Sequence, residues 1–184
     1  MDAWAFEHVV YGRVHEEDWG RLLRVMGFWP TWLAACVSLV LMDWPRGAAG
    51  ARRPALARGA QLLGTVTAAG IGGELLKLVF RRLRPTADYV AYAFRPWSDR
   101  PLHSGGLSLP STHAVVAFGA AVALTRLFPR AWPVWWGLAA GCGLTRILTG
   151  AHYVSDVGVA AVVAILVGKA MWREKGEGEL DRGV

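Results

Sequence analysis

The chain contains five apolar stretches, each close to the length that crosses the hydrocarbon core of a bilayer as a helix. Lipid cannot hydrogen-bond to free backbone N–H and C=O groups, so such stretches form helices. Most of the tryptophans lie at the edges of these stretches, where their rings favour the headgroup layer. We therefore expect an all-α, polytopic membrane helical bundle with spans at 26–43, 58–80, 112–128, 132–149 and 155–172.

The segments outside the spans indicate a single domain over 1–184, without an internal repeat. Residues 1–25 mix aromatic and charged side chains, which predicts a helix in the membrane interface; a solvated tail is the alternative. Residues 173–184 are charged and rich in glycine, and we expect a flexible tail there.

Counting the crossings places four helix ends and the long loop 81–111 on one side of the membrane, which we call the active side. The opposite side carries short, arginine-rich loops, so the positive-inside rule predicts that it is cytoplasmic, although the active side also carries several arginines. We expect a bacterial inner (plasma) membrane protein whose active side faces the periplasm. The formal net charge is +6, and the arginines lie in short loops and beside the spans rather than along one polar face. This distribution favours anionic lipid over nucleic acid as a partner. The oligomeric state remains open.

Two cations mark the active-side end of the second span. In "KLVFRRLRP", Lys77 and Arg84 are seven positions apart, which predicts that both project from one helical face toward an anion. Snorkelling at a helix end is the alternative, with Glu74 as the partner of Lys77.

The third span begins with "PSTH", which contains Ser111, Thr112 and His113. Backbone N–H groups at a helix start are free and favour an anion. The alternative is that Ser111 or Thr112 only caps the helix and that His113 is an interfacial ring.

Three ionisable groups lie between the last two spans, in "TRILTGAHYVSD". His152 and Asp156 stand at i and i+4, so that imidazole and carboxylate can meet on one helical face, with Arg146 just before them. A structural ion pair at the helix junction is the alternative.

Together, these groups match the requirements of metal-free phosphoryl transfer. Guanidinium groups bind phosphate oxygens in bidentate fashion, and a neutral imidazole, with an ordinary pKa of about 6.5, can attack phosphorus. The sequence places no cluster of carboxylates nearby for Mg²⁺ or Ca²⁺. We therefore expect neither a cofactor nor a metal.

These three blocks resemble the signature of the type 2 phosphatidic acid phosphatase superfamily, in order and in internal spacing, over residues 77–156. The resemblance implies that His152 is the nucleophile that forms a phosphohistidine and that Asp156 orients it. His113 would protonate the leaving lipid oxygen and later help to activate water. The implied phosphate-binding residues are Lys77, Arg84, Ser111, Thr112 and Arg146.

The chain departs from the family pattern at two motif positions. Thr112 stands where the family usually has glycine and adds a side chain that would narrow the choice of headgroups. Thr145 stands where the family usually has serine.

The family commonly has six spans rather than five. Soluble vanadium-dependent haloperoxidases share the signature, but their helices need not be this apolar.

The sequence as a whole predicts an integral membrane lipid phosphatase. Three substrates compete: a polyprenyl pyrophosphate, phosphatidylglycerol phosphate or phosphatidate, and lipid A 1-phosphate. A lipid phosphotransferase and a noncatalytic channel or transporter are the rival functions. Arg95 and Arg100, in the aromatic-rich loop 86–109, are candidate contacts for a second phosphate or the headgroup; a solvated loop is the alternative.

Overall fold

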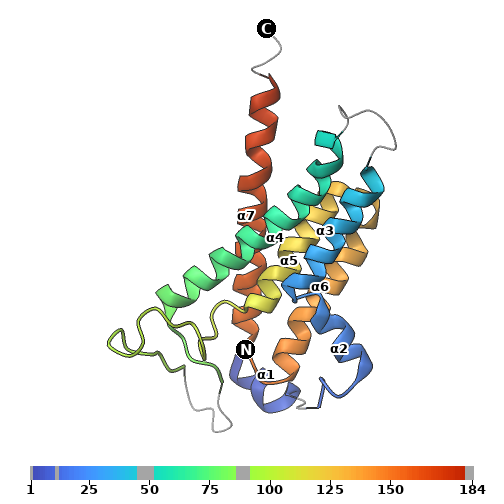
Figure 1. Ribbon diagram of the computed structural model, residues 1–184. Helices are drawn as coiled ribbons and strands as arrows, with labels where there is room; N and C mark the ends of the chain where they lie inside the picture. The colour runs from blue at the N-terminus through green and yellow to red at the C-terminus, as the bar shows by residue number, and fades with distance from the viewer. Residues whose placement is uncertain (1, 11–12, 45–51, 86–91, 181–184) are drawn as a thin grey trace.

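The computed structural model describes residues 2–10, 13–44, 52–85 and 92–180 of the 184-residue chain. Within these ranges the regular structure is helical, and β-pairing is limited to two isolated bridges. The α-helices are α1 (Asp2–Val9), α2 (Asp18–Val25), α3 (Trp29–Asp43), α4 (Arg52–Phe80), α5 (Thr112–Leu127), α6 (Trp132–Leu148) and α7 (Val154–Leu180), with a short 3₁₀ turn at Pro129–Ala131 (Figure 1). The expected all-α class is confirmed.

Helix α5 forms the centre of the bundle and packs against α4, α6 and α7, while α3 packs on α4 (Figure 1). Small side chains permit this close packing, as expected for helices in a membrane bundle. A Cβ added at Gly119 of α5 would lie 2.9 Å from the Cβ of Ala69 of α4. The backbones of α4 and α5 therefore approach more closely than two larger residues would allow.

Among the residues that the structure describes, two helical segments are long and apolar enough to cross a membrane, Leu56–Phe80 and Val154–Trp172. Helices α2 and α3 together pass the same test as a third span bent by 65°. Helices α5 and α6 have 16 and 17 residues, and at 1.5 Å per residue they are only about 25 Å long. The expected count of five spans is therefore not confirmed and stays a prediction.

The segment 1–25 forms two short helices rather than one. Helices α1 and α2 lie below the active-side ends of the bundle, where α2 packs on α6 (Figure 1). The chain bends between α2 and α3 at Gly27, where an added Cβ would lie 2.7 Å from the carbonyl oxygen of His113. The absence of a side chain at Gly27 therefore allows the backbone of this bend to pack in direct contact with the start of α5.

The flexible tail expected at residues 173–184 stays a prediction. Helix α7 continues through residue 180, and only 181–184 fall outside the described residues. The segment "REKGEGEL" contains several strong helix formers, which offset the cost of its two glycines.

Candidate active site

The end of α4 corrects one expectation about the first motif. The helix ends at Phe80, and Arg81 takes a left-handed conformation with φ 55°. Residues 82 and 83 then form isolated bridges with 94 and 107. Lys77 and Arg84 therefore do not share a helical face, because Arg84 lies beyond the helix, yet both line the same cavity.

The run "RRLR" sends its arginines to different places. Arg81 is buried and donates to the carbonyl oxygens of Arg95 at 3.0 Å and Asp99 at 2.6 Å, among others. It thereby fixes the loop that follows. Arg82 turns to the opposite side, toward Asp156. Arg84 is exposed and lines the cavity, and its phosphate-binding role stays a prediction.

The start of α5 presents a hydroxyl group that is not used as a helix cap. Ser111 occupies the N-cap position without a side-chain capping bond, and its Oγ is buried without a hydrogen-bond partner in the described part of the chain. The first N–H groups of a helix also lack intrahelical partners. This helix start therefore offers unsatisfied donors to an anion.

Thr112, which stands where the family usually has glycine, makes two polar contacts through its hydroxyl group. Its Oγ1 lies 2.5 Å from Lys77 Nζ and 2.5 Å from Glu74 Oε1. Lys77 Nζ also lies 3.2 Å from the same Glu74 oxygen, so the three polar groups form a closed triangle. Thr112 thus ties the lysine of α4 to the start of α5.

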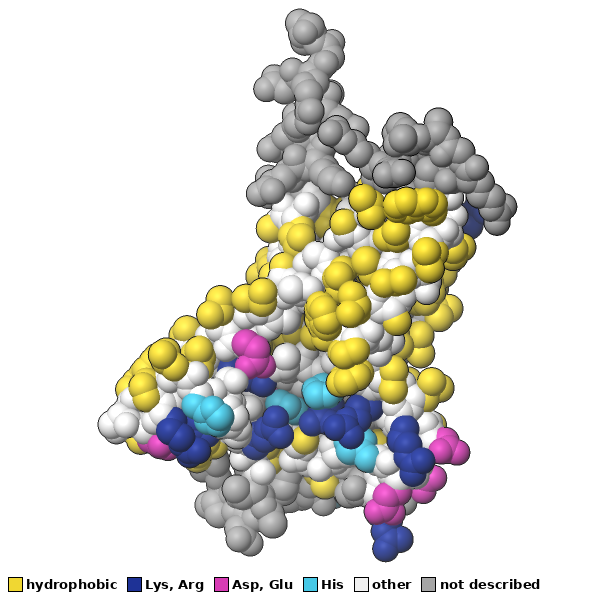
Figure 2. Space-filling view, in the orientation of Figure 1, with side chains coloured by type: hydrophobic (Ala, Val, Ile, Leu, Met, Phe, Trp, Pro, Cys, Tyr) yellow, Lys and Arg dark blue, Asp and Glu magenta, His cyan; other side chains and the backbone are white. Residues whose placement is uncertain are grey.

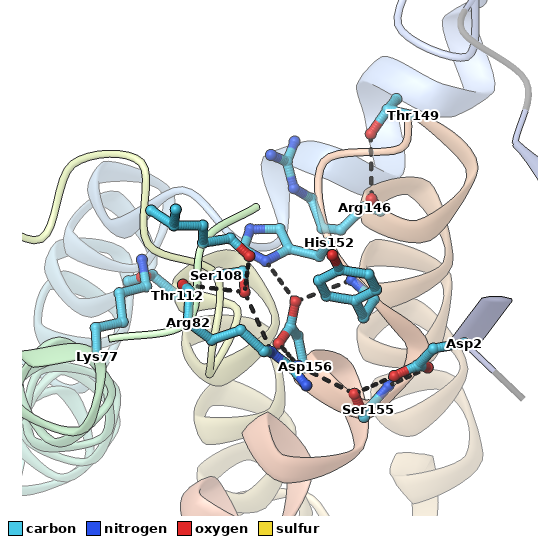
Figure 3. A network of polar contacts seen from close by, with 12 residues as sticks. Asp2, Lys77, Arg82, Ser108, Thr112, Arg146, Thr149, His152, Ser155 and Asp156 are labelled. Atoms are coloured by element: carbon cyan, nitrogen blue, oxygen red, sulfur yellow. Dashed lines mark hydrogen bonds and ion pairs between the residues drawn. The ribbon is translucent and has the colours of Figure 1, made fainter. Parts of the chain in front are cut away.

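The junction between α6 and α7 brings His152 beside Arg146. Gly150, with φ 66°, takes the left-handed conformation that commonly ends a helix. The backbone N–H groups of Ala151 and His152 both donate to the carbonyl oxygen of Arg146, each at 3.2 Å. The chain therefore folds back on the end of α6, and Figure 3 shows the Arg146 side chain beside His152.

Asp156 is the centre of the polar network. Its Oδ2 lies 3.3 Å from His152 Nδ1 and accepts the backbone N–H of Tyr153 at 2.9 Å. The sequence predicted that His152 and Asp156 share a helical face. Helix α7 begins only at Val154, however, so His152 precedes the helix. The i, i+4 contact still forms, because a carboxylate in the first turn reaches back over the N-cap.

The other oxygen of Asp156 forms an ion pair with Arg82, which the sequence analysis did not single out (Figure 3). The Arg82 guanidinium also donates to Ser155 Oγ at 3.0 Å and lies 4.8 Å from the centre of the Tyr153 ring. Arg82 sits inside the first motif, but no spacing rule relates it to a residue 74 positions away.

A cavity of about 320 Å³ joins the motif residues. Both histidines line it, which brings together the second and third motifs. Figure 2 shows that Lys, Arg and His side chains gather in a band across the molecule, below a largely hydrophobic surface. The polar residues that line the cavity are Glu74, Lys77, Arg84, Thr112, His113 and His152.

Arg146 is buried, and its NH1 group lies 3.3 Å from His15 Nε2. Its Nε has no hydrogen-bond partner within the described ranges. A buried guanidinium N–H without an acceptor is costly, so the position favours binding of an anion.

Two further candidates lie in the loop. Arg95 is buried and donates to the carbonyl oxygens of His103 at 2.8 Å and Gly105 at 2.5 Å. Arg100 is exposed and pairs with Asp99. Arg95 therefore serves the loop structure in this state. Of the aromatic residues expected in the loop, Tyr89 lies outside the described residues.

Burial lowers the pKa of His152, although the hydrogen bond and the charge of Asp156 act to raise it. The positive charges of Arg146 and Arg84 add to the lowering. These effects favour the neutral imidazole, which is the nucleophilic form.

Among the residues that the structure describes, no three His, Cys, Asp or Glu side chains are placed to hold one metal ion. The positive charge at the cavity comes instead from Lys and Arg side chains.

Comparison with known proteins identifies the family. The family model of the PAP2 superfamily matches residues 58–177. Since this match covers more than half of the chain and contains all three motifs, the chain belongs to the PAP2 superfamily, and the resemblance inferred from the motifs is confirmed.

Two curated relatives are each named lipid A 1-phosphatase. The relative from Rhizobium etli is 37% identical over 156 residues, which cover 77% of this chain and 63% of the relative. The relative from Rhizobium johnstonii is 44% identical over 103 residues, 54% of this chain and 40% of the relative. The chain thus spans less than two thirds of the length of either. No solved structure matches the chain.

Proposed function

We propose that this protein is an integral membrane lipid phosphatase that hydrolyses a phosphate monoester or pyrophosphate of a lipid through a phosphohistidine on His152. The observation that carries the proposal is the shared cavity, onto which two histidines and the cations Lys77 and Arg84 open. The Nδ1 atom of His152 is engaged by Asp156, which leaves Nε2 as the atom for attack. The membership in the PAP2 superfamily supports this assignment.

In the proposed reaction, the phosphate binds among Lys77, Arg84, Arg146 and the start of α5. Nε2 of His152 attacks phosphorus, the bond to the lipid oxygen breaks, and His113 gives that oxygen a proton. Water then attacks the phosphohistidine and releases inorganic phosphate, with His113 accepting the proton. The cations stabilise the charge on the equatorial oxygens, so the proposal needs no metal.

A neighbouring cavity supports a lipid as the substrate. This cavity of about 420 Å³ is lined mainly by apolar side chains, among them Ile71 and Leu75. It shares Glu74 and Thr112 with the cavity that contains the histidines. An apolar tail therefore has a place beside the phosphate.

The names of the two Rhizobium relatives make lipid A 1-phosphate the first substrate to test. The proposed location is the bacterial inner membrane with the site facing the periplasm, because arginine-rich loops lie on the opposite side.

A phosphate-release panel tests the proposal. Purified protein is given lipid A 1-phosphate, phosphatidylglycerol phosphate, phosphatidate and a polyprenyl pyrophosphate, with His152→Ala as the blank. The proposal predicts release of inorganic phosphate from at least one lipid and a loss of about 10³-fold or more in His152→Ala, with folding preserved. Transfer of phosphate to a second lipid without free phosphate would favour a phosphotransferase. Unchanged turnover in His152→Ala would refute the mechanism.

A further inference from the structure

A third cavity, of about 450 Å³, adjoins the cavity that contains the histidines, on the side of α2. Its lining comprises Arg21, Arg24, Val25, Phe28 and His113. Phe28 and His113 line both cavities. A molecule bound at the histidines can therefore extend past His113 into this third cavity.

Helix α2 presents two arginines to this cavity, three positions apart and so on one helical face. Arg21 is engaged locally, because its guanidinium donates to the carbonyl oxygens of His15 at 3.0 Å and Glu16 at 2.5 Å. Arg24 is different. Its side chain is exposed and has no hydrogen bond and no ion pair with any residue that the structure describes.

The surroundings of Arg24 are cationic rather than acidic. Burial lowers the pKa of His15, and the positive charges of Arg24 and Arg146 lower it further. His15 Nδ1 is itself buried without a partner in the described segments. Like charges held close together repel, and an anion among them relieves that repulsion. In the proposed reaction the substrate phosphate at His152 supplies one anion, whereas Arg24 lines a separate cavity.

The direction of the proposed reaction indicates what occupies this cavity. In an in-line displacement the leaving oxygen departs from the face of phosphorus opposite the nucleophile, where His113 protonates it. The part of the leaving group next to that oxygen then lies on the His113 side, whereas the apolar tail, further from phosphorus, has its place in the cavity of Ile71 and Leu75. We propose that Arg24, with Arg21 beside it, binds a second anionic group, a phosphate or a carboxylate, carried by the leaving portion of the lipid substrate. This inference rests on the proposed function.

The test compares two lipids that differ by one phosphate. Hydrolysis of phosphatidate releases diacylglycerol, which is an uncharged leaving group. Hydrolysis of diacylglycerol pyrophosphate at its terminal phosphate releases phosphatidate, which is an anionic leaving group. Both are assayed in an uncharged detergent, so that no anionic membrane lipid competes for Arg24. The variants are Arg24→Gln, Arg24→Lys as the charge-preserving companion, and Arg130→Gln as an exposed control on the opposite side.

We expect Arg24→Gln to lower kcat/KM for diacylglycerol pyrophosphate about 10- to 100-fold, the loss expected for one charge-assisted contact, and to change kcat/KM for phosphatidate less than about threefold. Arg24→Lys should recover much of the loss, and Arg130→Gln should match the wild type. An equal loss on both lipids, or none on the pyrophosphate, would overturn the inference.

The same proteins are titrated with methylenediphosphonate and with methylphosphonate, neither of which is hydrolysed. The subsite predicts that only the diphosphonate loses affinity in Arg24→Gln. A wild type that binds the diphosphonate but releases phosphate from neither lipid would contradict the proposed function and not the subsite. Equal affinity of wild type and Arg24→Gln for the diphosphonate would contradict the subsite alone.

Discussion

The guanidinium of Arg82 pairs with the carboxylate of Asp156 in the interior, where their side chains are 7% and 0% exposed. The same carboxylate lies 3.3 Å from His152 Nδ1. Asp156 therefore has a permanent cation on one oxygen and the proposed nucleophile on the other. Arg82 is a positioning residue in this arrangement, since it acts on His152 through Asp156.

Replacing Arg82 should therefore affect both stability and turnover. Arg82→Gln leaves a buried carboxylate without its cation, and breaking such a pair costs about 3–5 kcal/mol. For a chain of this size we expect a fall in Tm of at least about 6 °C in detergent. We also expect kcat to fall at least about tenfold. Arg126→Gln, at an exposed position of α5, is the matched control and should leave both values nearly unchanged. Identical behaviour of the two variants would contradict this role.

The pH profile tests the protonation state of His152. Its pKa is lowered by burial, so the neutral nucleophile persists below the ordinary imidazole value. As the pH falls through the lowered pKa, protonation removes the nucleophile, and kcat/KM should decline with a midpoint below about 6.5. Asp156→Asn removes the contributions that raise the pKa. In that variant the midpoint should move to still lower pH, while the maximal rate drops at least about tenfold. A midpoint above 6.5 in the wild type would be inconsistent with this account.

Thr112 should hold Lys77 in position for the phosphate. Its Oγ1 is 2.5 Å from Lys77 Nζ, and this contact is absent in a variant without the hydroxyl. We expect Thr112→Ala to raise KM about 3- to 10-fold, corresponding to one lost hydrogen bond, with a smaller effect on kcat. Thr112→Ser keeps the hydroxyl and should behave like the wild type. Equal KM values for the alanine and serine variants would show that the hydroxyl has no such role.

Chelators and vanadate test the proposal that side-chain cations suffice. Prolonged treatment with EDTA should leave the rate of phosphate release within about twofold, because Lys77, Arg84 and Arg146 neutralise the transition state. Vanadate, which mimics pentacoordinate phosphorus, should inhibit in competition with substrate. A rate that falls at least tenfold in EDTA and returns with a divalent cation would require a metal in the mechanism.

The sequence predicted the parts of the site that depend on short spacings. His152 and Asp156 are four residues apart, and a helix start just after His152 is enough to bring them together. Gly150 and the proline before Ser111 mark helix ends in the sequence. The candidate site residues near these ends could therefore be predicted from the sequence. The family motifs then related the three blocks to one another.

Other parts depend on packing that no local pattern encodes. Lys77 and Arg84 share a cavity only because α4 stops at Phe80 and the chain then turns. The spacing in the sequence predicted instead that the helix continues to Arg84. Arg82 reaches Asp156 across the fold, and Arg24 reaches the site because the bend at Gly27 lays α2 beside His113. Arginine-rich segments contain several equivalent candidates, and only tertiary contacts distinguish them.

Trapping of the covalent intermediate tests the central claim most directly. Wild-type protein is mixed with a lipid substrate labelled in its terminal phosphate, quenched at alkaline pH within milliseconds to seconds, and digested for mass spectrometry. The account predicts a transient phosphoramidate on the peptide that contains His152, absent in His152→Ala. Phosphate release at the normal rate with no label on this peptide, or with the label on another residue, would contradict it.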